Sequence, residues 1–431
     1  MSRELFGTDG VRGLAGTYPL DEAGSVRIGM AVGTHFAQPG QGVVIGWDPR
    51  ESSAGLVDGL IKGLTAVGVN VTKAGVLPTP GLAYLTREGK DFVAGVMVTA
   101  SHNPYQYNGV KVFDADGGKL TDEIETTLNK LIVDGVEERG SGEVKEATEL
   151  VKSYEDFLVA SAGDFRLDGT ALAVDSANGA AYGLAARVFE RLGAEVTALF
   201  DKPDGRNIND GCSATDTKAL SQRVVADKLA FGVALDGDAD RLMLIDEQGR
   251  QLNGDHIMYI LAAAGNLPGV VLTVMSNLGV ENALKAKGIK VERAEVGDRY
   301  VLESLRKTGF KLGGEQSGHI ILPALIEAGD ALLVAIQVIK ATQTSGKTLA
   351  EWRDEVTMLS QALVNMPLAD KKALGKPEVQ AFIKAQTAQL GDKGRLLVRP
   401  SGTEPLARVM VEAPDAQALA EQIVAKLKEL L

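Results

Sequence analysis

Apolar and amphipathic stretches alternate along most of the chain, and one order of elements occurs three times. Each copy has an apolar run, a polar or glycine-bearing turn, an amphipathic stretch, and a glycine that leads into a second apolar run. The copies lie at residues 42–71, 171–196 and 270–291, with helices predicted at 53–67, 183–192 and 280–287. Strand, helix and strand in close succession are typical of βαβ units with parallel strands. The pattern predicts three related α/β domains, although three similar units could also lie in one large sheet.

The chain after about residue 361 has a different order of elements. Helices are predicted at 377–389 and 415–430, with strands at 395–398 and 407–412 between them. This order indicates a small α+β domain. A charged, glycine-bearing stretch at 134–149 marks the first domain boundary. We therefore expect an α/β protein of three related domains with mixed sheets and a smaller C-terminal domain, divided as 1–148, 149–252, 253–361 and 362–431.

Composition restricts the class of protein. The chain has 431 residues, of which 45% are apolar and 24% charged, as in soluble α/β proteins. A net charge of −12 argues against nucleic-acid binding, which needs clustered positive charge, so a bound phosphate is expected to belong to a small molecule. The single cysteine, Cys212, cannot form an internal disulfide and indicates a reducing compartment. We see no apolar leader and no apolar run of roughly 18 residues, and expect a cytoplasmic protein without a membrane partner.

Ser101 is the first candidate for chemistry. It follows the apolar run 92–98, in the segment Thr-Ala-Ser-His-Asn-Pro. A buried strand that opens into a loop presents the hydroxyl at the edge of a sheet, where a nucleophile is expected.

Three carboxylates at alternate positions form the second candidate. Asp236, Asp238 and Asp240 are followed by Arg241, and strand-like runs lie on both sides. This is ligand chemistry for a hard divalent cation. An EF-hand loop is disfavoured because Arg241 stands where that loop needs glycine, and a solvated acidic turn is the remaining alternative. A serine phosphate beside Mg²⁺ and an arginine would be a group held ready for transfer, so the two candidates explain each other.

Two further loops have the composition of anion and sugar sites. Around residues 396–405 a strand ends in an arginine that hydroxyls and a glycine follow, which suits phosphate, although a hairpin turn would use the same residues. At 313–319, three glycines surround a carboxylate, an amide, a hydroxyl and an imidazole, which suits sugar hydroxyls. His319 alone would more often be a structural histidine.

With these motifs, the chain resembles the α-D-phosphohexomutase superfamily over essentially its whole length, and within it the bacterial phosphoglucosamine mutase branch. The matching segments are 6–13, 99–111, 236–241, 275–277, 296–301, 314–319 and 399–405. The resemblance implies four domains around a central cleft, each contributing one loop, with a C-terminal domain that closes over the cleft.

The resemblance also implies roles for individual residues. Ser101 would be the phosphoserine, and its phosphate would join Asp236, Asp238 and Asp240 in binding one Mg²⁺. Arg12 and Arg241 would contact the transferring phosphoryl group, and Lys111 would be a candidate for proton transfer. His102 would support the Ser101 loop, and His319 would take part in substrate binding or acid–base catalysis. A surface position is the alternative for Lys111. Glu315, Gln316 and Ser317 would hold the sugar, while Arg399, Ser401, Gly402, Thr403 and Arg408 would bind the phosphate that does not react.

The implied reaction interconverts glucosamine 6-phosphate and glucosamine 1-phosphate through a 1,6-bisphosphate, with a hexosamine or hexose 1,6-bisphosphate as activator. It would supply UDP-N-acetylglucosamine and cell-wall synthesis. Some residues, among them Thr99, Ala239 and Pro400, are more typical of the phosphomannomutase and phosphoglucomutase branch, which remains the alternative. A sugar-phosphate sensor without turnover is a further hypothesis. Sugar phosphates are the expected partners, and the pattern is compatible with a monomer or a homodimer.

Overall fold

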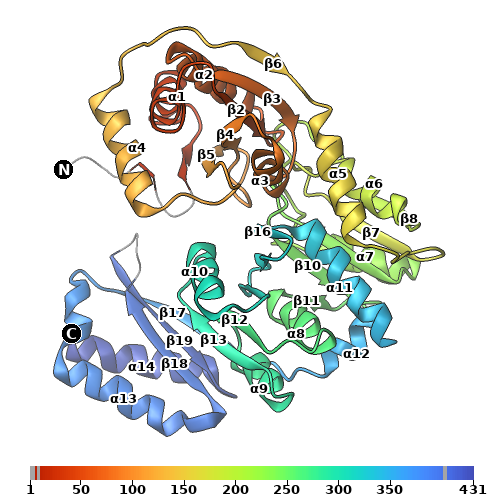
Figure 1. Ribbon diagram of the computed structural model, residues 1–431. Helices are drawn as coiled ribbons and strands as arrows, with labels where there is room; N and C mark the ends of the chain where they lie inside the picture. Colours follow the sequence, from red (N-terminus) through yellow and green to blue (C-terminus); the bar gives the residue numbers. More distant parts are fainter. Residues whose placement is uncertain (1–4, 7–9, 401–404) are drawn as a thin grey trace. The chain divides into compact units, whose positions relative to one another are not determined.

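The computed structural model describes residues 5, 6, 10–400 and 405–431 (Figure 1). The chain forms two compact units. One contains Met1–Val274 and Ile289–Arg353, and the other contains Met275–Gly288 and Asp354–Leu431. Ser401, Gly402 and Thr403 of the predicted phosphate loop, and residues 7–9 of the first motif, lie outside the described residues.

The first sheet belongs to the larger unit and has six strands in the order β1-β5-β4-β2-β3-β6. β4, β2, β3 and β6 are parallel to one another, whereas β5 is antiparallel to both β4 and β1. The elements are β1 (Val11–Leu14), α1 (Glu22–Phe36), β2 (Gly42–Trp47), α2 (Ser53–Ala66), β3 (Asn70–Val76), α3 (Thr79–Glu88), β4 (Phe92–Val98), β5 (Tyr107–Asp114), α4 (Asp122–Asp134) and β6 (Val144–Glu146).

Glycines bring the first two helices close together. A Cβ at Gly29 of α1 would lie 2.3 Å from the carbonyl oxygen of Leu60 in α2, and one at Gly63 of α2 would lie 2.1 Å from that of Val26. The absent side chains let the two backbones approach, and buried residues of both helices join the core of the first sheet.

The second sheet has the strand order β11-β10-β9-β7-β8 and also belongs to the larger unit. β8, β7 and β9 are parallel, and β10 is antiparallel to β9 and β11. The elements are α5 (Leu150–Ser161), β7 (Ala171–Asp175), α6 (Leu184–Arg191), β8 (Glu195–Leu199), α7 (Lys218–Asp227), β9 (Phe231–Leu235), β10 (Leu242–Ile245) and β11 (Gln251–Leu252).

The third sheet has the order β13-β12-β14-β15-β16. β13, β12 and β14 are parallel, and β15 is antiparallel to β14 and β16. The elements are α8 (Gly254–Ala264), β12 (Gly269–Thr273), α9 (Leu278–Ala286), β13 (Lys290–Ala294), α10 (Asp298–Thr308), β14 (Gly313–Gly314), β15 (Ile320–Leu322), β16 (Ile326–Gly329), α11 (Ala331–Ser345) and α12 (Leu349–Asp354). Of these, α9 belongs to the smaller unit.

The smaller unit contains a three-stranded antiparallel sheet of order β17-β19-β18. Its elements are β17 (Gln361–Pro367), η1 (Lys371–Gly375), α13 (Pro377–Leu390), η2 (Gly391–Lys393), β18 (Arg395–Pro400), β19 (Leu406–Glu412) and α14 (Ala416–Leu430). The core between this sheet and its helices includes Met366, Val409 and Leu427.

The predicted repeat is confirmed. All three copies form a strand, a helix and a parallel strand, and they lie in three separate sheets, so the alternative of one large sheet is wrong. The α/β class with mixed sheets and a smaller C-terminal domain is confirmed as well. The apolar run of the third copy ends as a strand at Thr273, because Asn277 already accepts a hydrogen bond from the N–H of Gly279 and begins α9. None of the helices in the described ranges has the length and apolar character needed to cross a bilayer.

Candidate active site

Ser101 lies in the loop between β4 and β5, in the larger unit. The residue is 1% exposed, and its backbone has a positive φ of 51°, which turns the chain sharply after the strand. Its Oγ donates a hydrogen bond to Asp236 Oδ2 at 2.7 Å and lies 3.3 Å from Nδ1 of His102. The predicted nucleophile and the first predicted metal ligand are therefore in contact, although 135 positions separate them in the sequence.

The three predicted metal ligands lie together in the loop between β9 and β10. Asp236, Asp238 and Asp240 are buried, and one carboxylate oxygen of each lies within 4.8 Å of the others. Oδ1 of Asp238 and Oδ1 of Asp240 are buried and accept no hydrogen bond from any described residue. Three converging carboxylates with open oxygens fit a hard divalent cation, and a solvated acidic turn does not account for their burial.

Two carboxyl groups of this loop have pKa values shifted in opposite directions. Burial, and then repulsion by Asp240 and Asp238, raises the pKa of the Asp236 carboxyl. Burial also acts to raise the pKa of Asp240, but the nearby cations, Lys111 first among them, hold that pKa well below its ordinary value. The loop thus concentrates negative charge that a cation would offset.

Lys111 supplies part of that positive charge. It lies on β5, is 3% exposed, and its Nζ donates to Asp238 Oδ2 at 2.8 Å and to Asp240 Oδ2 at 3.2 Å. The alternative of a surface lysine is therefore wrong.

Two arginines affect the neighbour of Ser101. Burial first, and then the charges of Arg241 and Arg12, lower the pKa of His102 from 6.5 to about 4. His102 is therefore neutral near pH 7. Arg241 follows the metal loop, and although burial acts to lower its pKa, the carboxylates of Asp240 and Asp236 raise it. Both arginines thus lie near the Ser101 loop, where a transferring phosphoryl group would need cations.

His319 connects the third sheet to the metal loop. It is buried, with Nδ1 3.7 Å from Asp240 Oδ2 and Nε2 3.3 Å from Asp298 Oδ2. Burial acts to lower the pKa of His319, but Asp240 and then Asp298 raise it above its ordinary value. A Cβ at Gly329 would lie 2.4 Å from the imidazole ring, so this position must be glycine for the ring to fit.

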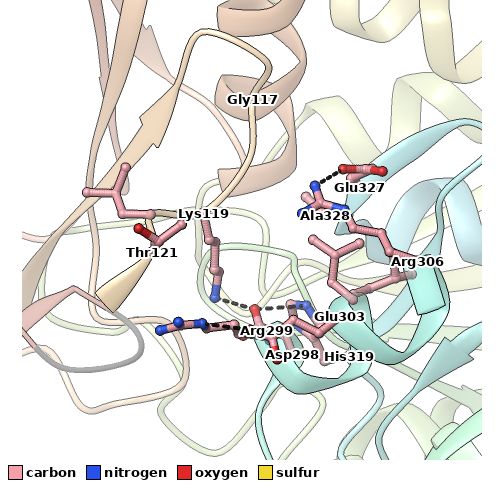
Figure 2. Close-up of a pocket in the computed structure, with 13 residues that line it drawn as sticks. Gly117, Lys119, Thr121, Asp298, Arg299, Glu303, Arg306, His319, Glu327 and Ala328 are labelled. Carbon is pink, nitrogen blue, oxygen red and sulfur yellow. Dashed lines mark hydrogen bonds and ion pairs between the residues drawn. The ribbon is translucent and has the colours of Figure 1, made fainter. Parts of the chain in front are cut away.

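Asp298 and Lys119 were not given roles from the sequence. Figure 2 shows Lys119 and His319 directed at the Asp298 carboxylate from two sides. The three residues line a pocket with a volume of about 80 Å³. Asp298 begins α10, whereas Lys119 follows β5, so the pair joins the first and third sheets. The segment 296–301 was recognisable as a motif, but nothing in its pattern shows that Asp298 contacts His319.

The predicted sugar loop lies between β14 and β15. Glu315, Gln316 and Ser317 are half-buried, and Ser317 Oγ donates to Glu315 Oε2 at 3.0 Å. The loop is attached to β10 through a hydrogen bond from the N–H of Leu242 to the carbonyl oxygen of Gly318 at 3.1 Å. Gly318 has a φ of 92°, and a Cβ there would lie 2.2 Å from the Leu242 oxygen. The polar groups of this loop are thereby held beside the metal loop.

Thr79 was missed by the sequence analysis. It begins α3, and its Oγ1 donates to Asp238 Oδ2 at 2.6 Å while its N–H donates to the Asp238 carbonyl at 3.0 Å. The two residues are 159 positions apart, and a Thr-Pro pair at a helix start is an ordinary N-terminal sequence. No local signal indicated this contact.

The predicted phosphate loop belongs to the smaller unit. Arg399 on β18 and Arg408 on β19 are paired directly across the antiparallel ladder. Like charges in such a pair repel each other, and an anion bound by both would offset the repulsion.

The larger unit thus unites a buried hydroxyl, three carboxylates, an ammonium, two imidazoles and two guanidinium groups. This set can hold a phosphorylated serine, neutralise its charge and transfer a proton at an adjacent hydroxyl, as phosphoryl transfer requires.

Comparison with known proteins gives a consistent result over the whole chain. Four family models match in order. They are the Phosphoglucomutase/phosphomannomutase alpha/beta/alpha domain I at residues 3–138, domain II at 145–249, domain III at 253–359 and the C-terminal domain at 363–430.

Curated relatives match at full length. A phosphoglucosamine mutase of Thermus thermophilus is 45% identical over 99% of this chain and 98% of its own, and phosphoglucosamine mutase 2 of Shewanella amazonensis is 43% identical over 96% of each. Among solved structures, a phosphoglucomutase/phosphomannomutase family protein from Burkholderia thailandensis superimposes with a TM-score of 0.84 at 26% identity, covering 100% of this chain and 97% of its own. An Aspergillus fumigatus N-acetylphosphoglucosamine mutase, solved with GlcNAc-6P and magnesium, shares the fold with a TM-score of 0.70 at 20% identity, covering 99% and 96%.

Proposed function

The chain belongs to the phosphoglucomutase/phosphomannomutase family, and from this membership we propose that it interconverts glucosamine 6-phosphate and glucosamine 1-phosphate through a phosphorylated Ser101. The superfamily resemblance drawn from the motifs is thereby confirmed. The choice of a hexosamine phosphate rests on the full-length relatives named phosphoglucosamine mutase.

One observation carries the proposal. The hydroxyl of Ser101 is buried, lies 2.7 Å from Asp236, and faces a loop in which three carboxylates converge. A serine that only packed in a core would not need this concentration of charge. A serine that carries a phosphoryl group does, because its phosphate must be neutralised before transfer.

The reaction has two phosphoryl transfers. In the first, the bond between the serine oxygen and phosphorus breaks as the free hydroxyl of the sugar monophosphate bonds to phosphorus; the sugar hydroxyl gives up its proton and the serine oxygen takes one up. The products are a 1,6-bisphosphate and free Ser101. After the bisphosphate has reversed its orientation, the Ser101 hydroxyl bonds to its other phosphoryl group and gives up its proton, while the released sugar oxygen takes one up. The sum is an isomerisation without hydrolysis, and a hexose or hexosamine 1,6-bisphosphate activates the enzyme by phosphorylating Ser101.

The residues around Ser101 have separate roles in the proposed reaction. Arg241 and Arg12 balance the charge of the phosphoryl group in transit. Lys111 and His319 are the proposed residues for exchanging the proton of the sugar hydroxyl. In support of this role, their nitrogens lie 3.2 and 3.7 Å from the same oxygen of Asp240, beside the metal loop. Glu315, Gln316 and Ser317 orient the sugar ring.

Asp236, Asp238 and Asp240 would hold one Mg²⁺, because this ion prefers carboxylate oxygens and the three side chains converge. When bound, Mg²⁺ would supply charge neutralisation at the serine phosphate. In this proposal Arg399 and Arg408, with Ser401, Gly402 and Thr403, bind the phosphate that is not being transferred.

A coupled assay tests the substrate and the serine together. The purified protein is supplied with Mg²⁺ and a trace of glucose 1,6-bisphosphate, and turnover is compared on glucosamine, glucose and mannose 6-phosphates, with Ser101→Ala as control. We expect the highest kcat/KM on the glucosamine ester and none in the variant. Preference for glucose or mannose esters would assign the chain to the sister activity. Absence of serine-dependent turnover on all three would favour a sensor.

A further inference from the structure

A buried arginine lies beside the Ser101 loop and contacts its backbone. Arg50 follows β2 and its side chain is inaccessible to solvent, as is that of its partner Asp48, whose Oδ2 lies 2.8 Å from Arg50 Nε. A buried guanidinium is costly unless all its donors are used. The partners of its remaining N–H groups therefore indicate the role of Arg50.

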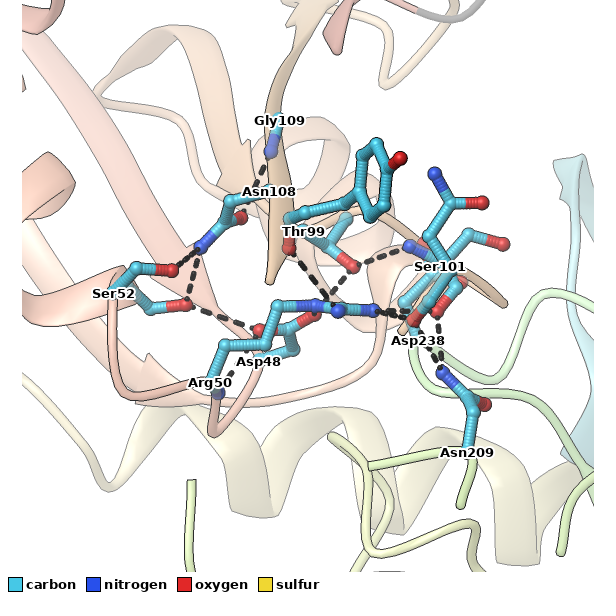
Figure 3. Close-up of polar contacts among 12 residues, drawn as sticks. Asp48, Arg50, Ser52, Thr99, Ser101, Asn108, Gly109, Asn209 and Asp238 are labelled. Atoms are coloured by element: carbon cyan, nitrogen blue, oxygen red, sulfur yellow. Dashed lines mark hydrogen bonds and ion pairs between the residues drawn. The ribbon is translucent and has the colours of Figure 1, made fainter. Parts of the chain in front are cut away.

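All four remaining N–H groups of Arg50 bind carbonyl oxygens of one short segment. Nη2 donates to the carbonyls of Ser101 at 2.9 Å and Asn103 at 2.8 Å, and Nη1 donates to those of Pro104 at 2.6 Å and Tyr107 at 3.1 Å. Figure 3 shows the guanidinium directed along this loop. The rigid fork thus fixes the backbone from the nucleophile to the start of β5.

Asn209, from the second domain, binds two of the same carbonyl oxygens as Arg50. Asn209 lies between β8 and α7, and its Nδ2 donates to the carbonyls of Ser101 at 2.9 Å and Asn103 at 3.1 Å. The N–H of Ser101 donates to Thr99 Oγ1 at 3.0 Å, and that hydroxyl donates to Asp48 at 2.7 Å. Both the amide and the carbonyl of the nucleophile are therefore held.

From these contacts we propose that Arg50 and Asn209 are positioning residues, which hold the left-handed backbone of Ser101 so that its Oγ is directed at the metal loop. The inference rests on the proposed role of Ser101 as phosphoryl carrier. Asp48 balances the charge of Arg50, so the contribution of Arg50 is geometric. A lysine keeps the charge but cannot reach four carbonyls, and it will not substitute for the arginine.

The test is the rate at which glucose 1,6-bisphosphate with Mg²⁺ phosphorylates Ser101 in a single turnover, followed by quenched-flow and mass spectrometry in the full-length protein. We expect Arg50→Lys and Asn209→Ala to be slower by about 10- to 100-fold, because a displacement approaching 1 Å costs about that much. Steady-state measurements should show the loss in kcat, with KM for the sugar phosphate nearly unchanged.

Arg206→Lys is the matched control. Arg206 lies in the same region and pairs with Glu51 next to Arg50, but its side chain is 67% exposed, and the change is expected to leave the phosphorylation rate unaltered. Rates are expressed per folded molecule from denaturation curves, which removes a purely structural effect. If Arg50→Lys does not fold, the phosphorylation rate of Asn209→Ala tests the proposal, since that substitution leaves no buried charge unpaired.

Phosphorylation of both folded variants within threefold of the native rate would overturn the proposal. A native protein that takes no phosphate at Ser101 would instead refute the proposed function, so the two failures are distinguishable.

Discussion

Gly237 separates two of the metal ligands, and the account predicts that a single methyl group there disrupts catalysis. In Gly237→Ala the new Cβ would lie 2.5 Å from the carbonyl oxygen of Ser101, 2.8 Å from Nδ2 of Asn209 and 2.9 Å from Cδ1 of Ile208. The metal loop can approach the Ser101 loop closely only because this side chain is absent.

The magnitude follows from these distances. Ordinary van der Waals contact begins at 3.4 Å, so the Ser101 and metal loops must separate by about 0.9 Å. The Ser101 carbonyl cannot simply rotate away, because Arg50 and Asn209 each bind it at 2.9 Å. A displacement near 1 Å at a reacting group costs about 100-fold in rate, or about 2.7 kcal/mol of transition-state stabilisation. Overpacking would also reduce the free energy of unfolding by about 1–3 kcal/mol.

The assay compares kcat and KM of the native protein, Gly237→Ala and Gly55→Ala, with urea denaturation of each. Gly55 lies in α2, and a Cβ there meets nothing within 4 Å, so this control should keep native activity and gain up to about 1 kcal/mol of stability. A folded Gly237→Ala protein with kcat within threefold of native would refute the close packing of the two loops as a catalytic requirement.

Three further predictions test other parts of the site and fold. Lys111→Met removes the ammonium 2.8 Å from Asp238 and should lower kcat by about 100-fold or more, measured in the coupled assay; near-native turnover would exclude it from proton transfer. Gly318→Ala places a methyl group 2.2 Å from the Leu242 carbonyl at a φ of 92°, and urea denaturation should show a loss of about 3 kcal/mol, whereas an unchanged midpoint would contradict the attachment of the sugar loop. Burial lowers the pKa of His256 from 6.5 to about 4, so below pH 6.5 the unfolded chain takes up a proton that the folded protein does not, and stability falls as pH decreases towards 4. Between pH 7 and pH 5, His256→Gln should therefore lose about 2 kcal/mol less stability than the native protein, and parallel pH curves would contradict this.

The fold was largely predictable because its signals are local. The run at 92–98 coincides with β4, and the helix predicted at 377–389 is α13, which ends one residue later. The sequence analysis predicted no strand over β17, which lies at the boundary between the third and fourth domains, even though Ala362, Val364 and Met366 alternate inward along it.

The candidate site was predictable in part for a different reason. Asp236, Asp238 and Asp240 share one loop, so their convergence can be read from their spacing. The contacts of Thr79 with Asp238, of Asp298 with His319 and of Arg50 with the Ser101 loop join strands or loops that are distant in sequence. Only the packing of the sheets brings these residues together, and the periodicity of apolar residues in the sequence does not predict such contacts.

The measurement that tests the central claim most directly is the location and fate of one phosphoryl group. The native protein is incubated with Mg²⁺ and glucose 1,6-bisphosphate, freed of excess reagent, and digested for mass spectrometry before and after addition of glucosamine 6-phosphate. The account predicts stoichiometric phosphate on the peptide that contains Ser101, and its transfer to a glucosamine bisphosphate when the sugar is added. Mutase turnover with phosphate on another residue, or with Ser101 never phosphorylated, would contradict it.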